Sequence, residues 1–173
     1  KGGFQFEDAT VKAGLATDFW GTGASMVDVN NDGHLDLYVC CYRQPNKLYL
    51  NDGKGHFNAV SWTGGRFRHE DGTPLTQPPL DWGLTATFRD INGDGWPDLY
   101  VGNDFHENDY LYINNQKGGF TDQSPEILKH SSQFSMGVDA ADINNDGLTD
   151  IVSMDMLPYD DYMLRRSIAE DAY

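Results

Sequence analysis

The sequence is poor in cysteine, in basic residues and in long apolar runs. Its only cysteines, Cys40 and Cys41, are adjacent and would point to opposite faces of a strand. We therefore expect two half-buried strand residues without a disulfide, which leaves the cellular compartment open. No apolar run is long enough to span a membrane. Lys and Arg number 12 against 27 Asp and Glu, and no basic patch could neutralise phosphates, so we expect no nucleic-acid partner.

A nine-residue pattern, D-x-N-x-D-G-x-x-D, occurs three times in the 173 residues. Calcium takes about six to eight oxygens, which a short loop can supply from the side chains at positions 1, 3, 5 and 9 and the carbonyl at position 7. The glycine at position 6 lets the backbone reverse. Three Ca²⁺ sites are therefore predicted, with these ligands: Asp28, Asn30, Asp32, His34 (carbonyl) and Asp36; Asp90, Asn92, Asp94, Trp96 (carbonyl) and Asp98; Asp142, Asn144, Asp146, Leu148 (carbonyl) and Asp150.

An EF-hand and an acidic turn that serves solubility are the two alternatives to these calcium loops. An EF-hand needs a Glu at position 12 and a helix on each side, whereas position 12 here is Val39, Val101 or Ser153 and the flanks are β-branched and aromatic. Acidic turns that serve solubility alone would not place the carboxylates in register in three copies. The pattern therefore predicts calcium loops that each join two strands. Because such loop sites work where calcium is millimolar, we expect an extracellular, cell-surface or periplasmic location.

The three loops mark an internal repeat. The string Lys-Gly-Gly-Phe at residues 1–4 recurs at 117–120, and residues 54–57 are close to it. The units span roughly residues 4–57, 57–120 and 120–173, and the third is atypical towards its end. The second unit contains an additional Gly- and Pro-rich stretch, residues 62–81, which is predicted to be a long surface loop.

Four short strands in a unit of about 50–60 residues are typical of a β-propeller blade. The sequence therefore predicts an all-β fold of about three four-stranded antiparallel blades, which stack because one blade cannot bury both of its faces. Closed propellers have about four to eight blades. The chain also begins without Met and in the middle of the pattern. We therefore expect a fragment of a larger propeller.

The unit resembles the FG-GAP/VCBS repeat of integrin α-chain propellers and of many bacterial surface proteins. Residues 103–112, 135–139 and 155–158 are also similar to the bacterial cartilage-acidic-protein-like group, whose members often carry an ASPIC/UnbV tail that these residues lack. The resemblance implies that each calcium loop joins the first two strands of a blade. It also implies that a ligand binds at the opposite end, near residues 43–46, 104–108 and 62–81.

These observations favour a calcium-tied binding, adhesion or scaffold module of a cell-surface protein. We expect a protein or carbohydrate ligand, and packing against further blades or other chains. Ion binding would remove the repulsion among clustered carboxylates. The free energy of metal binding would therefore add to the free energy of unfolding. Aromatic residues that could anchor partners are Trp62, Trp82, Tyr159 and Tyr162. Packing between blades is the alternative for them, and we favour it for Trp82.

A propeller-scaffold enzyme, with its site opposite the calcium loops, is the alternative function. Its candidate residues are His106 and Glu107 in one loop, with His69, Glu70 and Asp71 in the stretch 62–81. The sequence contains no nucleophile elbow, zinc motif or phosphate loop. We therefore expect no enzymatic activity and assign no catalytic residue.

Overall fold

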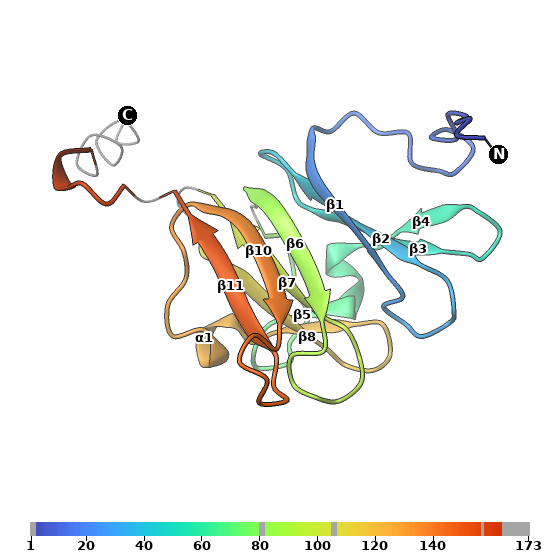
Figure 1. Cartoon of the computed structure of the whole chain (residues 1–173). Coiled ribbons are helices and arrows are strands. Elements are labelled where there is room, and N and C mark those ends of the chain that lie inside the picture. Colours follow the sequence, from blue (N-terminus) through green and yellow to red (C-terminus); the bar gives the residue numbers. More distant parts are fainter. Residues whose placement is uncertain (1–2, 80–81, 105–106, 157, 164–173) are drawn as a thin grey trace.

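The structure is a computed structural model that describes residues 3–79, 82–104, 107–156 and 158–163. Its strands form three sheets, which are stacked one on another (Figure 1). The first sheet contains β1 (Gly21–Val27), β2 (Asp36–Cys41), β3 (Lys47–Asn51) and β4 (Phe57–Ala59). The second contains β6 (Gly83–Arg89), β7 (Asp98–Asn103), β8 (Tyr110–Asn114) and β9 (Phe120–Asp122), with β5 (Phe67–Arg68) beside β9. The third contains β10 (Ser135–Ala141) and β11 (Asp150–Asp155).

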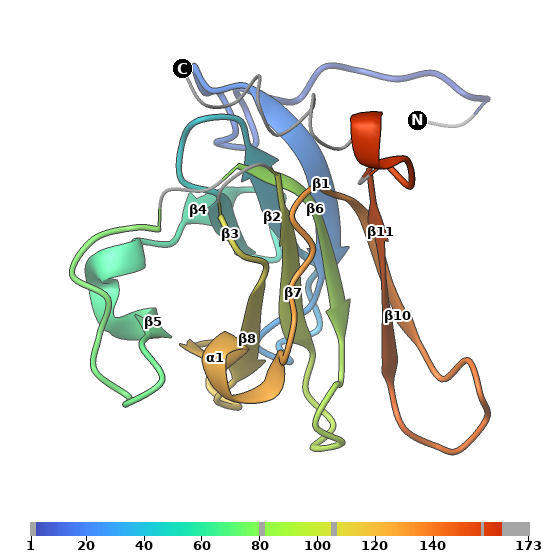
Figure 2. The ribbon, with the colours of Figure 1, turned by 90° about the vertical axis from the view of Figure 1, so that its left-hand side faces the viewer.

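The sheets pack face to face through their first strands. β1 lies on β6, and β6 lies on β10 (Figures 1 and 2). The second sheet is therefore covered on both faces, and all six residues of β7 are buried. This explains why β7 reads as an apolar run at Leu99, Tyr100 and Val101 instead of alternating with polar residues. The prediction of an all-β fold of stacked, propeller-like blades is confirmed, and the three sheets do not close into a ring.

The blades differ from the predicted four strands in two places. The second sheet gains β5, which runs parallel to β9. The third sheet has two strands over the described residues, and residues 158–163 add no strand to it. Two short helical turns lie between sheets: η1 (Trp62–Arg66) connects β4 of the first sheet to β5 of the second, and α1 (Ser124–Ile127) connects β9 of the second sheet to β10 of the third. Among the described residues, none of these helices has the length and hydropathy to cross a membrane.

The stretch 62–81 is more than the predicted surface loop. Trp62, Phe67 and Leu75 belong to the main core, at 7%, 1% and 9% exposure. The two cysteines are also more buried than expected, at 0% exposure each. Cys40 belongs to the main core, and Cys41 donates its backbone N–H to Asn46 Oδ1 at 2.8 Å. Neither cysteine forms a disulfide.

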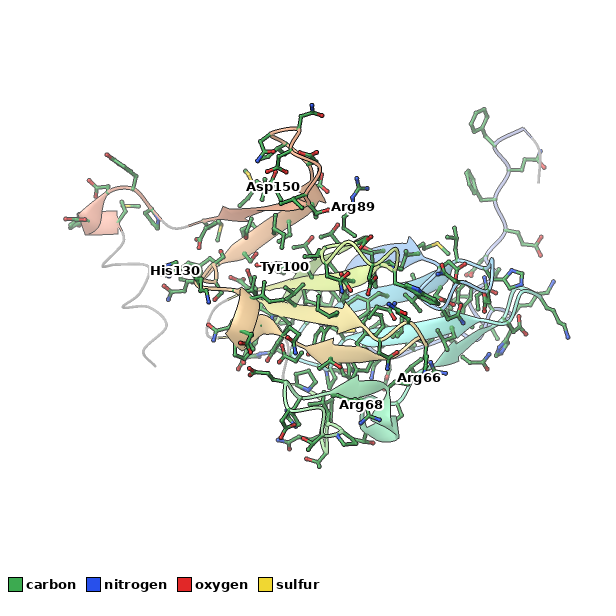
Figure 3. All side chains as sticks on the ribbon, turned by 90° about the horizontal axis from the view of Figure 1, so that it is seen from below. Arg66, Arg68, Arg89, Tyr100, His130 and Asp150 are labelled. Atoms are coloured by element: carbon green, nitrogen blue, oxygen red, sulfur yellow. The ribbon has the colours of Figure 1, made fainter. Side chains whose placement is uncertain are left out.

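A buried carboxylate lies at the junction of the second and third sheets. Asp109 is fully buried and accepts the Tyr100 hydroxyl at 2.7 Å and the Asn103 backbone N–H at 2.8 Å. Ser132 and Ser135 of the third unit also hydrogen-bond to it. Burial raises the pKa of Asp109, while these donors oppose that shift. Figure 3 labels Tyr100 between the second and third sheets.

Candidate functional site: three aspartate-rich loops and an aromatic cluster

Each nine-residue motif connects the first two strands of its sheet, as predicted. The three loops lie at the same end of the array, along the lower edge of Figure 1. In every loop, positions 4 and 6 have a left-handed backbone, with φ of 55°, 77° and 61° at position 4 and 87°, 86° and 87° at position 6. Position 4 is Asn31, Gly93 or Asn145, and Asn and Gly tolerate this conformation best.

The side-chain oxygens of positions 1 and 3 converge on the backbone N–H of position 5 within each loop. In the first loop, Asp28 Oδ1 and Asn30 Oδ1 both accept the backbone N–H of Asp32, at 3.1 and 3.2 Å. The matching distances are 3.0 and 3.0 Å in the second loop and 3.1 and 2.9 Å in the third. The position 3 amide also donates to the position 5 carboxylate, at 2.9, 3.1 and 3.0 Å. These hard oxygen donors are the kind that calcium prefers.

Position 7 helps to close the loops through its backbone. The N–H groups of His34, Trp96 and Leu148 donate to the position 5 carboxylate at 2.9, 2.9 and 2.8 Å. Over the described ranges, no group of three or more His, Cys, Asp or Glu side chains is arranged as a metal site. The oxygens are gathered around backbone N–H groups instead, so calcium binding by these loops stays a prediction.

The aspartate at position 9 ties the first loop to its sheet. Asp36 is 1% exposed. Its Oδ2 accepts the N–H of Val29 in the loop at 3.0 Å, and its Oδ1 accepts the N–H of Asn51 in β3 at 2.8 Å. From the sequence, this residue was predicted to complete the calcium coordination shell. Its contact with the third strand was not predicted.

The same tie is present in the second loop. Asp98 is fully buried and accepts the N–H groups of Ile91 at 2.9 Å and of Asn114, in β8, at 2.8 Å. In the third loop, Asp150 is half-buried and accepts the Ile143 N–H at 3.1 Å. Figure 3 places Asp150 at the root of its loop. The third sheet has no third strand over its described residues. Asp150 therefore lacks the bond to a third strand that Asp36 makes to β3 and Asp98 makes to β8.

The carboxylates of the loops differ in their electrostatics. Burial raises the pKa of Asp36 and Asp98, and backbone N–H donors oppose that shift. Hydrogen bonds lower the pKa of three exposed carboxylates. The Asn30 side chain donates to Asp32, the Trp96 backbone to Asp94 and the Gly147 backbone to Asp142. These hydrogen bonds favour the charged form of Asp32, Asp94 and Asp142.

Neighbouring loops are linked to one another by side chains. Asn114 Nδ2 donates to the Val29 carbonyl of the first loop at 2.9 Å and to the Pro97 carbonyl of the second at 3.1 Å. Thr149, in the third loop, donates to the Asp90 carbonyl of the second at 2.9 Å. These bonds join the loops of adjacent sheets directly.

An aromatic cluster lies at the opposite end of the first two sheets. Trp20 precedes β1, Tyr42 follows β2, and Trp82 precedes β6. The Tyr42 ring lies 5.3 Å from both indoles, measured between centroids. The Arg43 guanidinium lies 5.8 Å from the Tyr42 centroid and 5.2 Å from that of Trp82, within cation–π range. Arg43 also has a left-handed backbone, with φ of 55°.

This cluster remains accessible. Trp20 is 72% exposed, Arg43 is exposed, and Trp82 is half-buried. Among the described residues of the three predicted ligand-face segments, the cluster includes only Arg43 of residues 43–46, and Asn46 is fully buried. The sequence interpretation missed Trp20 and Tyr42 as surface anchors. Their signal was their position directly beside the strands that flank a calcium-type loop.

The candidate enzyme residues come together only in part. His69, Glu70 and Asp71 line one hollow of about 640 Å³, and His69 and Glu107 line an adjacent one of about 530 Å³. His106 lies outside the described residues. Of the four predicted aromatic anchors, Trp62 belongs to the core, while Tyr159 and Tyr162 are exposed at 105% and 66%.

The comparison with protein families identifies the repeat. The FG-GAP-like repeat description matches residues 28–101 and 90–153, and each match contains two of the aspartate-rich loops. No curated protein sequence matches the chain significantly.

Proposed function

The chain belongs to the FG-GAP-like repeat family, and from this premise we propose that it is a calcium-stabilised binding module of an extracellular or cell-surface protein. FG-GAP repeats are typically extracellular, non-enzymatic modules that bind other molecules. The single observation that carries the calcium part is that the side-chain oxygens at positions 1 and 3 converge on the position 5 N–H in all three loops.

The loops would serve stability, and the opposite end would serve recognition. Calcium, when bound, supplies the positive charge that offsets the repulsion among the carboxylates of each loop. The ligand residues would be those at positions 1, 3 and 5, with the position 7 carbonyl and the position 9 carboxylate. Because side chains link the loops, this stabilisation would extend from one sheet to the next.

Calcium is expected to raise the melting temperature of the chain. At a free concentration about 100-fold above Kd, each site adds about 2.7 kcal/mol to the free energy of unfolding. For a chain of this size one site corresponds to a shift of roughly 5–10 °C. Differential scanning calorimetry in excess calcium and in excess EDTA measures it. Melting curves that overlay would show that the loops do not bind calcium.

A matched pair of variants assigns the shift to the loops. Asp32→Asn removes a carboxylate at position 5 and is expected to reduce the calcium-dependent shift. Asp52→Asn is the control, because Asp52 is also an exposed aspartate that accepts two backbone N–H groups in a turn, but outside the motifs. Equal reductions in both variants would indicate non-specific charge screening.

The exposed aromatic cluster is the proposed partner surface, and it suits a protein or carbohydrate ligand. Trp, Tyr and Arg dominate the energetics of interfaces because they present large apolar areas with polar edges. The Trp20→Ala/Arg43→Ala double variant is expected to bind at least about tenfold more weakly to the ligands found for the unmodified chain on glycan and cell-surface protein arrays. The control is Phe6→Ala, whose side chain is 93% exposed at another site. Undiminished binding by the double variant would place the partner surface elsewhere.

A further inference from the structure

The second aspartate-rich loop differs from the other two at position 4. Gly93 occupies this position, where the first and third loops carry Asn31 and Asn145. The asparagine at position 3 is therefore followed by glycine in this loop alone, and Asn92–Gly93 is the only Asn-Gly pair in the sequence. Asn92 and Gly93 are both exposed to water.

The residue after an asparagine decides how readily the asparagine side chain reacts with the backbone. The nitrogen of that next residue can attack the side-chain carbonyl carbon, Cγ, and a Cβ on the next residue crowds the approach. Glycine has no Cβ and is free in its backbone conformation. Asn31 and Asn145 therefore hinder, in the first and third loops, a reaction that Gly93 permits in the second.

Hydrogen bonds in the second loop act on both reacting groups. Asn92 Oδ1 takes the negative charge when Cγ is attacked, and it accepts the Asp94 N–H at 3.0 Å. A backbone donor at that oxygen stabilises the developing charge. The Gly93 N–H, which must lose its proton, donates to the Asp90 carboxylate at 2.8 Å. A charged acceptor draws this proton away from the nitrogen and makes the nitrogen a better nucleophile.

We propose that Asn92 is a site of spontaneous covalent modification, which the chain itself converts to aspartate or isoaspartate through a cyclic succinimide shared with Gly93. The Gly93 nitrogen bonds to Asn92 Cγ and gives its proton to hydroxide. The Cγ–Nδ2 bond then breaks, and the amide nitrogen leaves as ammonia with a proton from water. Water opens the ring at the Cγ carbonyl to give aspartate, or at the main-chain carbonyl to give isoaspartate. Water is consumed and ammonia released, and nothing is oxidised or reduced.

Either product changes the second loop. Asn92 Nδ2 donates to Asp94 Oδ2 at 3.1 Å, and in the aspartate form two carboxylates meet there and repel each other. The isoaspartate form lengthens the backbone by one carbon atom, which shifts the Asp94 N–H relative to Asp90 Oδ1, its acceptor at 3.0 Å. The second loop is also bonded to both of its neighbours. The modification therefore alters the loop that joins the other two.

Peptide mapping by mass spectrometry, during storage in EDTA at mildly alkaline pH, tests the proposal. The peptide containing Asn92 is expected to gain the mass difference between an amide and an acid, and to separate into aspartate and isoaspartate forms. Asn92 is expected to react at least about tenfold faster than Asn30 or Asn144, which corresponds to about 1.4 kcal/mol in the barrier. Asp-Gly pairs such as Asp94–Gly95 release water when they form the same ring, so they do not produce this mass gain.

Two reciprocal variants exchange position 4 between the loops. Gly93→Asn gives the second loop the residue of the other two and is expected to slow the reaction at Asn92 to the rate at Asn30. Asn31→Gly is expected to create the fast reaction at Asn30. Asn and Gly both suit the left-handed backbone here, with φ of 77° at Gly93 and 55° at Asn31. A Cβ at Gly93 would meet no other atom within 4 Å, so the exchange causes no clash.

The proposal is wrong if Asn92 keeps its amide as long as Asn30 and Asn144 do, or if aspartate forms without isoaspartate. It is also wrong if Gly93→Asn reacts as fast as the unmodified chain, or if Asn31→Gly leaves Asn30 unreactive. Circular dichroism checks folding, and Asn31→Gly decides the test if Gly93→Asn does not fold. The modification goes beyond the proposed function and needs neither calcium nor a partner, so its failure would leave that function untouched.

Discussion

Replacing Asp98 by alanine is expected to lower the free energy of unfolding by about 3 kcal/mol, even in EDTA. The Asp98 carboxylate accepts the N–H groups of Ile91 at 2.9 Å, Asn92 at 3.4 Å and Asn114 at 2.8 Å. Alanine leaves these donors without an acceptor, and the Asn114 N–H is buried in β8, where water cannot replace the bond. The loss would also separate the second loop from the third strand of its sheet. Urea denaturation in EDTA measures the effect.

Two further variants separate this structural role from a metal-binding role. Asp98→Asn retains one acceptor oxygen and is expected to fall between the alanine variant and the unmodified chain. Asp94→Ala changes an exposed carboxylate of the same loop. It is expected to alter stability little in EDTA and to reduce the stabilisation by calcium. If Asp98→Ala behaves like Asp94→Ala in EDTA, the ninth residue has no structural role independent of metal.

The sequence predicts the strands best where the chemistry of a short motif and its flanks agree. The aspartate-rich loops require a reversal of the backbone, and their β-branched and aromatic flanks favour strands on both sides. Both signals are local, so they locate β1–β2, β6–β7 and β10–β11 without knowledge of the packing. The left-handed backbone at position 4 was also predictable, because Asn31, Gly93 and Asn145 are the residues that this conformation favours.

What the sequence could not predict depends on contacts between distant segments. The aromatic cluster unites Trp20 with Trp82, and their proximity depends on how the first sheet packs on the second. The role of Asp36 likewise depends on the third strand, which supplies the Asn51 N–H. The described part of the stretch 62–81 is largely exposed, as its glycines and prolines indicate, but the sequence did not show that Trp62, Phe67 and Leu75 are buried. Such residues contribute to the core once β5 pairs with β9.

The largest loss of stability is expected from Trp62→Ala, which tests whether this stretch is part of the core. The Trp62 ring lies 3.9 Å from the Phe67 ring and 6.1 Å from the Tyr112 ring, measured between centroids. Its Nε1 donates to the Asn46 carbonyl of the first sheet at 2.7 Å. One side chain thus joins the first sheet, the inserted stretch and the second sheet. Truncation of a buried tryptophan costs about 3–5 kcal/mol.

Two comparison variants show which part of the tryptophan matters. Trp62→Phe retains most of the aromatic packing but leaves the Asn46 carbonyl without its donor, so it is expected to cost about 1–3 kcal/mol. Thr76→Ala changes an exposed residue of the same stretch and is expected to have little effect. Urea denaturation of the three variants gives the order. A surface loop would give three small and similar losses, whereas a core segment gives a large loss for alanine, a smaller one for phenylalanine and almost none for Thr76→Ala.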